Sequence, residues 1–163
     1  MNRVLILGAG QYGQVAREIA EAMGCFDRIS FLDDNFSAAI GKLSDFNKCT
    51  NDFDSAVVAI GDAEKRLKLI EQLIGAGYDV PVLIHPRAYV APSADIGRGS
   101  FVEPMAVLHT DVQIGTGCII SAGTIINHNA VIGEGCHLNC CMIVGARANV
   151  PSCTKSDYGQ IIR

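Results

Sequence analysis

The sequence predicts a chain of two parts: a small Rossmann-like α/β domain over residues 1–86, followed by a left-handed parallel β-helix over residues 87–163. In the first part, short aliphatic runs typical of strands alternate with helical patterns. In the second part, an aliphatic residue recurs at every sixth position. The chain is 49% hydrophobic and 18% charged, so both parts can bury a core.

The first part is expected to hold a parallel sheet of about four strands. Its strands are predicted at residues 3–7, 28–32, 56–60 and 80–84, and its helices are predicted to end near residue 24 and to span about 63–74. Two mononucleotide-binding halves, which an NAD site normally spans, would need more strands than this.

A glycine-rich loop, Gly8-Ala-Gly-Gln-Tyr-Gly13, joins the first strand to the first helix. Its glycines would let backbone N–H groups approach a phosphate at the helix N-terminus. Asp33 and Asp34 follow the second strand and could accept hydrogen bonds from a ribose or a base. The alternative is that the loop is only a tight structural turn. The predicted binding residues are Gly8, Gly10, Gln11, Tyr12, Gly13, Asp33, Asp34 and Gly61.

The second part repeats with a period of six. Its aliphatic column reads Val90, Ile96, Val102, Leu108, Ile114, Ile120, Ile126, Ile132, Leu138, Val144 and Val150. The residues four positions later are mostly small, as expected for a three-sided coil with 18-residue turns that stack at the strand spacing of roughly 4.8 Å. Residues directly after the aliphatic column, such as Gly97, Gly115 and Asn127, are expected at corners that need positive φ.

The repeats are expected to give about three and two-thirds turns of coil. Ser156 stands where the next aliphatic residue would be, so the coil is expected to stop there and residues 156–163 to cap it. Cys118 and Cys136, 18 residues apart, are expected to stack inside the coil. Seven cysteines without a CxxC pair predict reduced thiols and no structural metal site.

Charge and hydropathy exclude several classes of function. A net charge of −4 does not suit a nucleic-acid-binding protein. The sequence has no apolar run of 18 residues, so we expect no membrane insertion, and its N-terminus lacks the apolar stretch of a signal peptide. A cytoplasmic location is therefore expected.

Four motifs together resemble one family: GAGQYG at residues 8–13, IGD at 60–62, IHP at 84–86 and NHNAVIGEGCH at 127–137. Over nearly the whole chain they resemble the bacterial sialic-acid O-acetyltransferases and the N-acetyltransferases of UDP-4-amino sugars such as bacillosamine. The resemblance implies a homotrimer, with acetyl-CoA along the β-helix between two subunits. It also implies a sugar or sugar-nucleotide acceptor held by the first domain.

Acyl transfer from a thioester needs a base for the attacking amine or hydroxyl group. His128 follows the corner residue Asn127 and is expected to project outward, and the resemblance gives it the role of general base. The family usually has Asp or Glu next, whereas this chain has Asn129, which can orient the imidazole but supplies no charge. The resemblance also implies that His137, half a turn later, binds or orients at the same inter-subunit site.

Three functions remain open from the sequence. The first is an acetyl-CoA-dependent sugar O- or N-acetyltransferase of bacterial surface glycan biosynthesis, which His128 favours. The second is a catalytically impaired trimeric binding or scaffold protein with a truncated CoA groove. Asn129, Cys141 in place of the usual glycine, and a coil that ends by Arg163 favour it. The third is a nicotinamide-binding protein, which only the GxGxxG loop supports.

Overall fold

The computed structural model describes residues 2–163, which fall into two compact units divided between Pro81 and Val82. The sequence placed this boundary five residues later, after residue 86. The difference arises because Leu83 and Ile84 pair with Phe101 and Val102, one 18-residue turn further on. The coil therefore begins before the first repeat recognised in the sequence.

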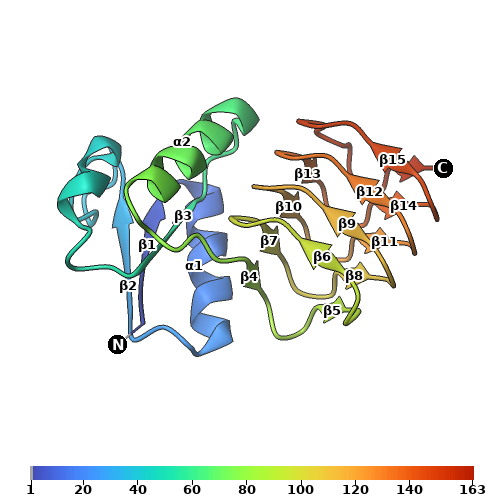
Figure 1. Cartoon of the computed structure of the whole chain (residues 1–163), viewed down its shortest axis with the longest axis horizontal. Helices are drawn as coiled ribbons and strands as arrows, with labels where there is room; N and C mark the ends of the chain where they lie inside the picture. Colours follow the sequence, from blue (N-terminus) through green and yellow to red (C-terminus); the bar gives the residue numbers. More distant parts are fainter. Residues whose placement is uncertain (1) are drawn as a thin grey trace. The chain divides into compact units, whose positions relative to one another are not determined.

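The first unit is built on a parallel sheet with the strand order β2-β1-β3 (Figure 1). The helix α1 and the short 3-10 helix η1 connect its strands, and the helix α2 follows the last of them. The elements are β1 (Arg3–Leu7), α1 (Gln11–Met23), β2 (Arg28–Leu32), η1 (Leu43–Lys48), β3 (Ser55–Val58) and α2 (Ala63–Gly75). The first three predicted strands and both predicted helices are confirmed to within two residues, whereas η1 has no counterpart in the prediction.

Burial explains why β1 lies in the middle of this sheet. Residues 4–7 are fully buried, as expected for a parallel strand with neighbours on both edges. On one face of the sheet, Leu5 and Leu7 form a core with Ile70 and Leu73 of α2. The carboxyl ends of all three strands lie at the same edge of the sheet, and the loops that leave this edge can converge on one ligand.

The predicted fourth strand of this sheet is wrong. In the described chain, the segment after α2 reaches the sheet only through an isolated bridge between Asp79 and Ser55. Pro81 follows, and it has no N–H to donate to a sheet ladder. Only Leu83 and Ile84 of the predicted strand are extended, and they belong to the coil.

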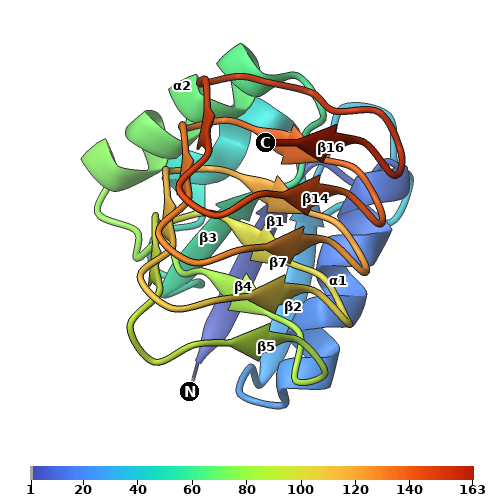
Figure 2. The same ribbon diagram turned by 90° about the vertical axis from the view of Figure 1, so that its right-hand side faces the viewer.

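The second unit is a parallel β-helix with three sheets, ordered β13-β10-β7-β4, β16-β14-β11-β8-β5 and β15-β12-β9-β6. Each strand has two residues, and the strands inside each sheet pair with strands 18 residues before and after them, as β10 does with β7 and β13. Figure 2 shows β5, β14 and β16 stacked along one side. The strands are β4 (Leu83–Ile84), β5 (Tyr89–Val90), β6 (Asp95–Ile96), β7 (Phe101–Val102), β8 (Val107–Leu108), β9 (Gln113–Ile114), β10 (Ile119–Ile120), β11 (Ile125–Ile126), β12 (Val131–Ile132), β13 (His137–Leu138), β14 (Ile143–Val144), β15 (Asn149–Val150) and β16 (Ile161–Ile162).

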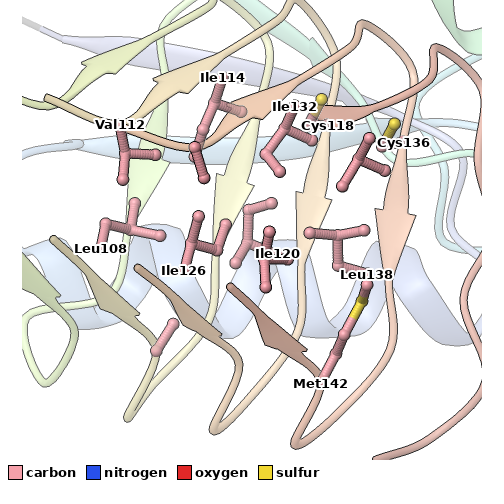
Figure 3. Close-up of a cluster of buried hydrophobic side chains, with 14 of the residues drawn as sticks. Leu108, Val112, Ile114, Cys118, Ile120, Ile126, Ile132, Cys136, Leu138 and Met142 are labelled. Carbon is pink, nitrogen blue, oxygen red and sulfur yellow. The ribbon is translucent and has the colours of Figure 1, made fainter. Parts of the chain in front are cut away.

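The aliphatic column fills the interior of the coil, as the six-residue period predicts (Figure 3). Leu108, Ile120, Ile126 and Leu138 are fully buried in it. Cys118 and Cys136 are also interior, and the Sγ of Cys118 lies 3.1 Å from the carbonyl oxygen of Gly133. Both cysteine side chains pack in the core of the coil.

The coil does not stop at Ser156, so the predicted capping tail is wrong. Ser156 is buried at the position of the missing aliphatic residue, and its Oγ accepts a hydrogen bond of 2.8 Å from the backbone N–H of Asn139. β16 then pairs with β14 and continues the coil. A hydrogen-bonded serine thus replaces one aliphatic residue without ending the repeat.

The corners of the coil also differ from the prediction. Positive φ occurs at the third residue after every aliphatic position from Ile96 to Val150, for example at Gly99 and Asn129, and not at the first. The glycines at the first position serve a different purpose. A Cβ on Gly97 would lie 2.5 Å from the carbonyl carbon of Gly115, and a Cβ on Gly115 would lie 2.5 Å from the amide nitrogen of Glu134. These glycines are required because consecutive turns approach closely at this corner.

We therefore expect Gly115→Ala to lower the free energy of unfolding by about 1–3 kcal/mol, because the new methyl group meets backbone atoms that cannot rotate away. Gly75→Ala is the control: a Cβ there meets nothing within 4 Å, and alanine favours the helix. Urea titrations of both variants measure the difference. Equal stability of the two variants would show that the glycine corner does not need its close spacing.

Candidate functional site

A pocket of about 340 Å³ lies in the first unit, where the loops after β1, β2 and β3 meet. Every residue predicted to bind a nucleotide lines it except Gly13. The lining residues are Gly8, Gly10, Gln11, Tyr12, Asp33, Asp34, Asn35, Leu43, Ala59, Ile60, Gly61 and Lys65. The pocket thus brings together residues up to 57 positions apart in the sequence.

Gly13 contributes to the pocket indirectly. A Cβ at this position would collide with the carbonyl oxygen of Gly8, so only glycine lets α1 start this close to β1. Gly8 itself has φ +99, which favours glycine. Gly10 is the N-cap of α1 and has no side chain that could cap the helix. A Cβ at this position would meet nothing within 4 Å. The pocket is therefore open beside the N-terminus of α1.

Asp33 has a structural role that the sequence did not reveal. One carboxylate oxygen accepts a hydrogen bond of 2.8 Å from the N–H of Ala9, and the other accepts hydrogen bonds from the N–H groups of Asn35 and Phe36. The hydrogen bond from Ala9 and those from Asn35 and Phe36 lower the pKa of Asp33, with a smaller contribution from the charge of Lys65. Asp33 joins the loops after β1 and β2 and thereby shapes the pocket.

Asp34 and Lys65 present their charges to the pocket more directly. Asp34 is exposed, and its Oδ1 accepts one hydrogen bond, from the N–H of Leu43. Lys65 lies in the first turn of α2, where its backbone N–H donates to Oδ1 of the N-cap Asp62 at 2.7 Å. Sequence analysis missed Lys65, because its place in the pocket depends on how α2 follows the turn after β3.

A second hollow of about 430 Å³ adjoins the pocket and lies between η1 and α2. It shares Asp34, Leu43 and Lys65 with the first pocket. Its other lining residues are Ser44, Phe46, Leu69 and Gln72. We call the two neighbouring hollows together the groove, with a glycine-lined compartment and a more apolar compartment, and Lys65 lines both.

Arg66 fixes the turn on the other side of the pocket. Its side chain is fully buried, and Nη1 donates to the carbonyl oxygens of Ile60 at 2.7 Å and Gly61 at 3.2 Å. Charge-assisted hydrogen bonds of this kind hold a turn more firmly than neutral ones. Two buried or partly buried charged residues, Asp33 and Arg66, therefore position the pocket loops.

The second candidate site is the corner of the coil after β11, where His128 is exposed as expected. The Nδ1 of His128 lies 3.0 Å from Oδ1 of Asn129, and its backbone N–H donates to Oδ1 of Asn127. An amide oxygen can only accept, so Nδ1 is the donor in this contact, and the neutral ring in this tautomer carries its lone pair on Nε2. Asn129 holds this geometry with φ 58, a conformation that asparagine tolerates better than most residues.

The structure does not bring His137 to His128 within one chain. His137 begins β13 in the sheet of β4, β7 and β10, whereas His128 lies in the turn between β11 and β12, which belong to the other two sheets. The Nε2 of His137 is 3.4 Å from Oγ of the buried Ser121. A site that uses both histidines needs a second copy of the chain.

Residues 2–163 show neither a cluster of metal ligands nor a helix that could span a membrane. No three His, Cys, Asp or Glu side chains in this range gather in a way that would hold a metal ion. The described helices are also too short or too polar for any of them to span a bilayer.

Comparison with known proteins relates both units to sugar-modifying transferases. The family model described as the PglD N-terminal domain matches residues 3–73, and that of the bacterial transferase hexapeptide (six repeats) matches residues 93–128. A UDP-N-acetylbacillosamine N-acetyltransferase from Bacillus subtilis is 31% identical over 111 residues. The match covers 63% of this chain and 51% of that relative, so it spans about half of the relative's length.

Solved structures resemble the whole chain. The acetyltransferase domain of PglB from Neisseria gonorrhoeae is 27% identical with a TM-score of 0.83, and the match covers 100% of this chain and 92% of that one. The same domain in complex with acetyl coenzyme A is 26% identical with a TM-score of 0.73, covering 95% and 96%. PerB from Caulobacter crescentus, in complex with CoA and GDP-perosamine, is 23% identical with a TM-score of 0.83, covering 100% and 89%. These likenesses confirm the predicted fold class, including the left-handed β-helix.

The hydrogen bonds of Asp33 predict a pH-dependent loss of stability in Asp33→Asn. We expect this variant to be less stable than wild type by about 1–2 kcal/mol at pH 7, because the charged acceptor is lost. The pKa of Asp33 is lowered in the folded protein, so its contribution is complete above the ordinary value of 3.8 and is lost as the pH falls through the lower folded value.

Urea titrations between pH 3 and pH 7 measure this difference, with Asp34→Asn as the control. A stability gap between wild type and Asp33→Asn that stays constant down to pH 3 would contradict the assigned hydrogen bonds.

Proposed function

We propose that the chain is a hexapeptide-repeat acetyltransferase with a PglD-type N-terminal domain, and that it transfers an acetyl group from acetyl-CoA to a sugar. The proposed acceptor is an amino sugar, a sugar nucleotide or a sialic-type sugar of bacterial surface glycan biosynthesis. The observation that carries this proposal is His128, exposed on the coil with Nδ1 held by Asn129 and Nε2 free. The use of acetyl-CoA suits a cytoplasmic enzyme.

His128 would act as the general base. The acceptor nitrogen or oxygen attacks the thioester carbonyl carbon, and Nε2 of His128 takes the proton that the acceptor loses. The new C–N or C–O bond replaces the C–S bond, and the proton on the imidazolium passes to the departing CoA sulfur. An imidazole suits both steps, because it accepts a proton as the neutral ring and donates it as the imidazolium.

Asn129 sets a limit on this base. Its amide oxygen fixes the tautomer and the ring orientation of His128, which is the positioning part of the task. It carries no charge, so it stabilises the imidazolium less than a carboxylate would. We therefore propose an active but less strongly assisted base, rather than the scaffold protein that Asn129 also allows.

The glycine-lined pocket is the proposed acceptor site. The loop from Gly8 to Gly13 offers backbone N–H groups beside the uncapped start of α1, which suits a phosphate. PerB binds GDP-perosamine and the Bacillus relative acts on a UDP-linked sugar, according to their names, so a nucleotide-linked amino sugar is the acceptor we favour. A three-stranded sheet provides one mononucleotide-binding half and does not favour the nicotinamide alternative.

We also propose that the protein is a homotrimer that buries one side of the coil. The outward positions of the sheet β16-β14-β11-β8-β5 form an apolar column: Tyr89, Val107, Ile125, Ile143 and Ile161. By contrast, the outward positions on the sheet β15-β12-β9-β6 are mostly polar. Exposed columns of this kind mark subunit interfaces.

The first test of this proposal is His128→Ala. CoA release from acetyl-CoA with a UDP-linked 4-amino sugar is expected to fall by about 10²–10⁴-fold, the usual contribution of a general base. His109→Ala is the matched control, since His109 is also exposed, in the corresponding corner one turn earlier. Turnover in His128→Ala equal to that of the control would remove the base assignment. Acetyl-CoA binding by wild type without CoA release from any acceptor would favour the scaffold protein.

The second test is Ile143→Asp. Ile143 is 39% exposed and lies in the apolar column, and a buried carboxylate there is expected to dissociate the trimer and abolish turnover. Val131→Asp, equally exposed on the adjacent sheet, is the control and should stay trimeric. Sedimentation velocity measures both. A monomeric wild-type protein, or a trimeric Ile143→Asp, would exclude this interface.

A further inference from the structure

Lys65 is the one cation among the residues that line the two compartments of the groove. Within residues 2–163 its ammonium group forms no ion pair, although Asp33 and Asp34 line the same pocket. We infer that Lys65 is a specificity-determining residue that selects nucleoside-diphosphate-linked acceptors over free sugars. This inference rests on the proposed function and assigns its acceptor class to one side chain.

The charges of the pocket make such a residue necessary. Without Lys65, the lining would carry two carboxylates and no cation, and a diphosphate would add two further negative charges. Like charges at this range repel, so backbone N–H groups alone would have to overcome both acids. The charge of Lys65 already reaches Asp33, whose pKa it helps to lower. The same positive field acts on any phosphate that enters beside the glycine loop.

Lys65 lies where the negatively charged diphosphate of a bound nucleoside diphosphate is expected. Lys65 lines both compartments, so a ligand that spans them passes beside this residue. The compartment with Leu43, Phe46 and Leu69 suits a flat nucleobase, and Ser44 and Gln72 offer polar groups to its edge. The glycine-lined compartment suits phosphate. A free sugar would leave the apolar compartment empty and Lys65 without a counter-charge.

Hydrogen bonds of its neighbours fix the backbone of Lys65 at the groove. Asp62 caps α2 and accepts a hydrogen bond from the backbone N–H of Lys65, which fixes the first turn of the helix. Arg66, the next residue, is anchored on the carbonyl groups of Ile60 and Gly61. The backbone of Lys65 is thus held between two anchored neighbours, while its side chain stays exposed at the groove.

The test is calorimetric titration of the full chain with UDP, GDP and uridine. Lys65→Met is expected to weaken binding of UDP or GDP at least tenfold and to leave uridine binding unchanged. Lys65→Arg is expected to stay within about threefold of wild type, since it keeps the charge. Lys68→Met is the matched control, an exposed lysine of the same helix that lines neither compartment. Raising the salt concentration should weaken UDP binding more in wild type than in Lys65→Met.

Each outcome decides a separate claim. Equal UDP affinity in Lys65→Met and Lys68→Met would overturn the role of Lys65 and leave the nucleotide pocket intact. A wild-type protein that binds neither UDP nor GDP would overturn the nucleotide pocket and the role of Lys65 together. His128→Ala should still bind UDP as wild type does, so a failure of the catalytic proposal is distinguishable from a failure of this one.

Discussion

The close stacking of two-residue strands, 18 residues apart, is the constraint on which the second unit depends. Each strand inside its sheet pairs in register with the turn before and the turn after, as Ile119 does with Phe101 and His137. This stacking requires glycine where consecutive corners nearly touch, as at Gly97 and Gly115. It also determines which residues face outward at each corner. His128 is exposed because the residues on either side of its corner, Ile126 and Ala130, must point into the coil.

The first unit depends on a different device, since its pocket is made of loops rather than of a repeat. Three strands end at one edge, and charged residues join the loops that leave it. Asp33 connects the loops after β1 and β2, and Arg66 holds the turn after β3. Loops with such anchors can present backbone N–H groups in a fixed geometry, which lowers the ordering cost of binding.

The sequence predicted the coil because its signal is periodic and local. Eleven aliphatic residues at a spacing of six leave few other folds. The prediction from the sequence failed where a residue departs from the six-residue period but still occupies the interior position of the coil. Ser156 stays in the coil because its hydroxyl group finds a buried partner on Asn139. The positive-φ corners were assigned to the wrong position because glycine serves two needs, backbone conformation and close approach, which the sequence does not separate.

The candidate sites were predictable only in part. The glycine loop and His128 belong to recognisable motifs, and the structure places them in a pocket and on an exposed corner. Lys65 and the structural role of Asp33 depend on contacts between loops distant in sequence, for which no local pattern exists.

The central claim is that the two units together acetylate a nucleotide-linked amino sugar. The most direct measurement is acetyl-CoA-dependent CoA release by the wild-type protein across UDP- and GDP-linked amino sugars and the corresponding free sugars. Release well above hydrolysis with a nucleotide-linked acceptor is the expected result, and no release with any of them would contradict the account.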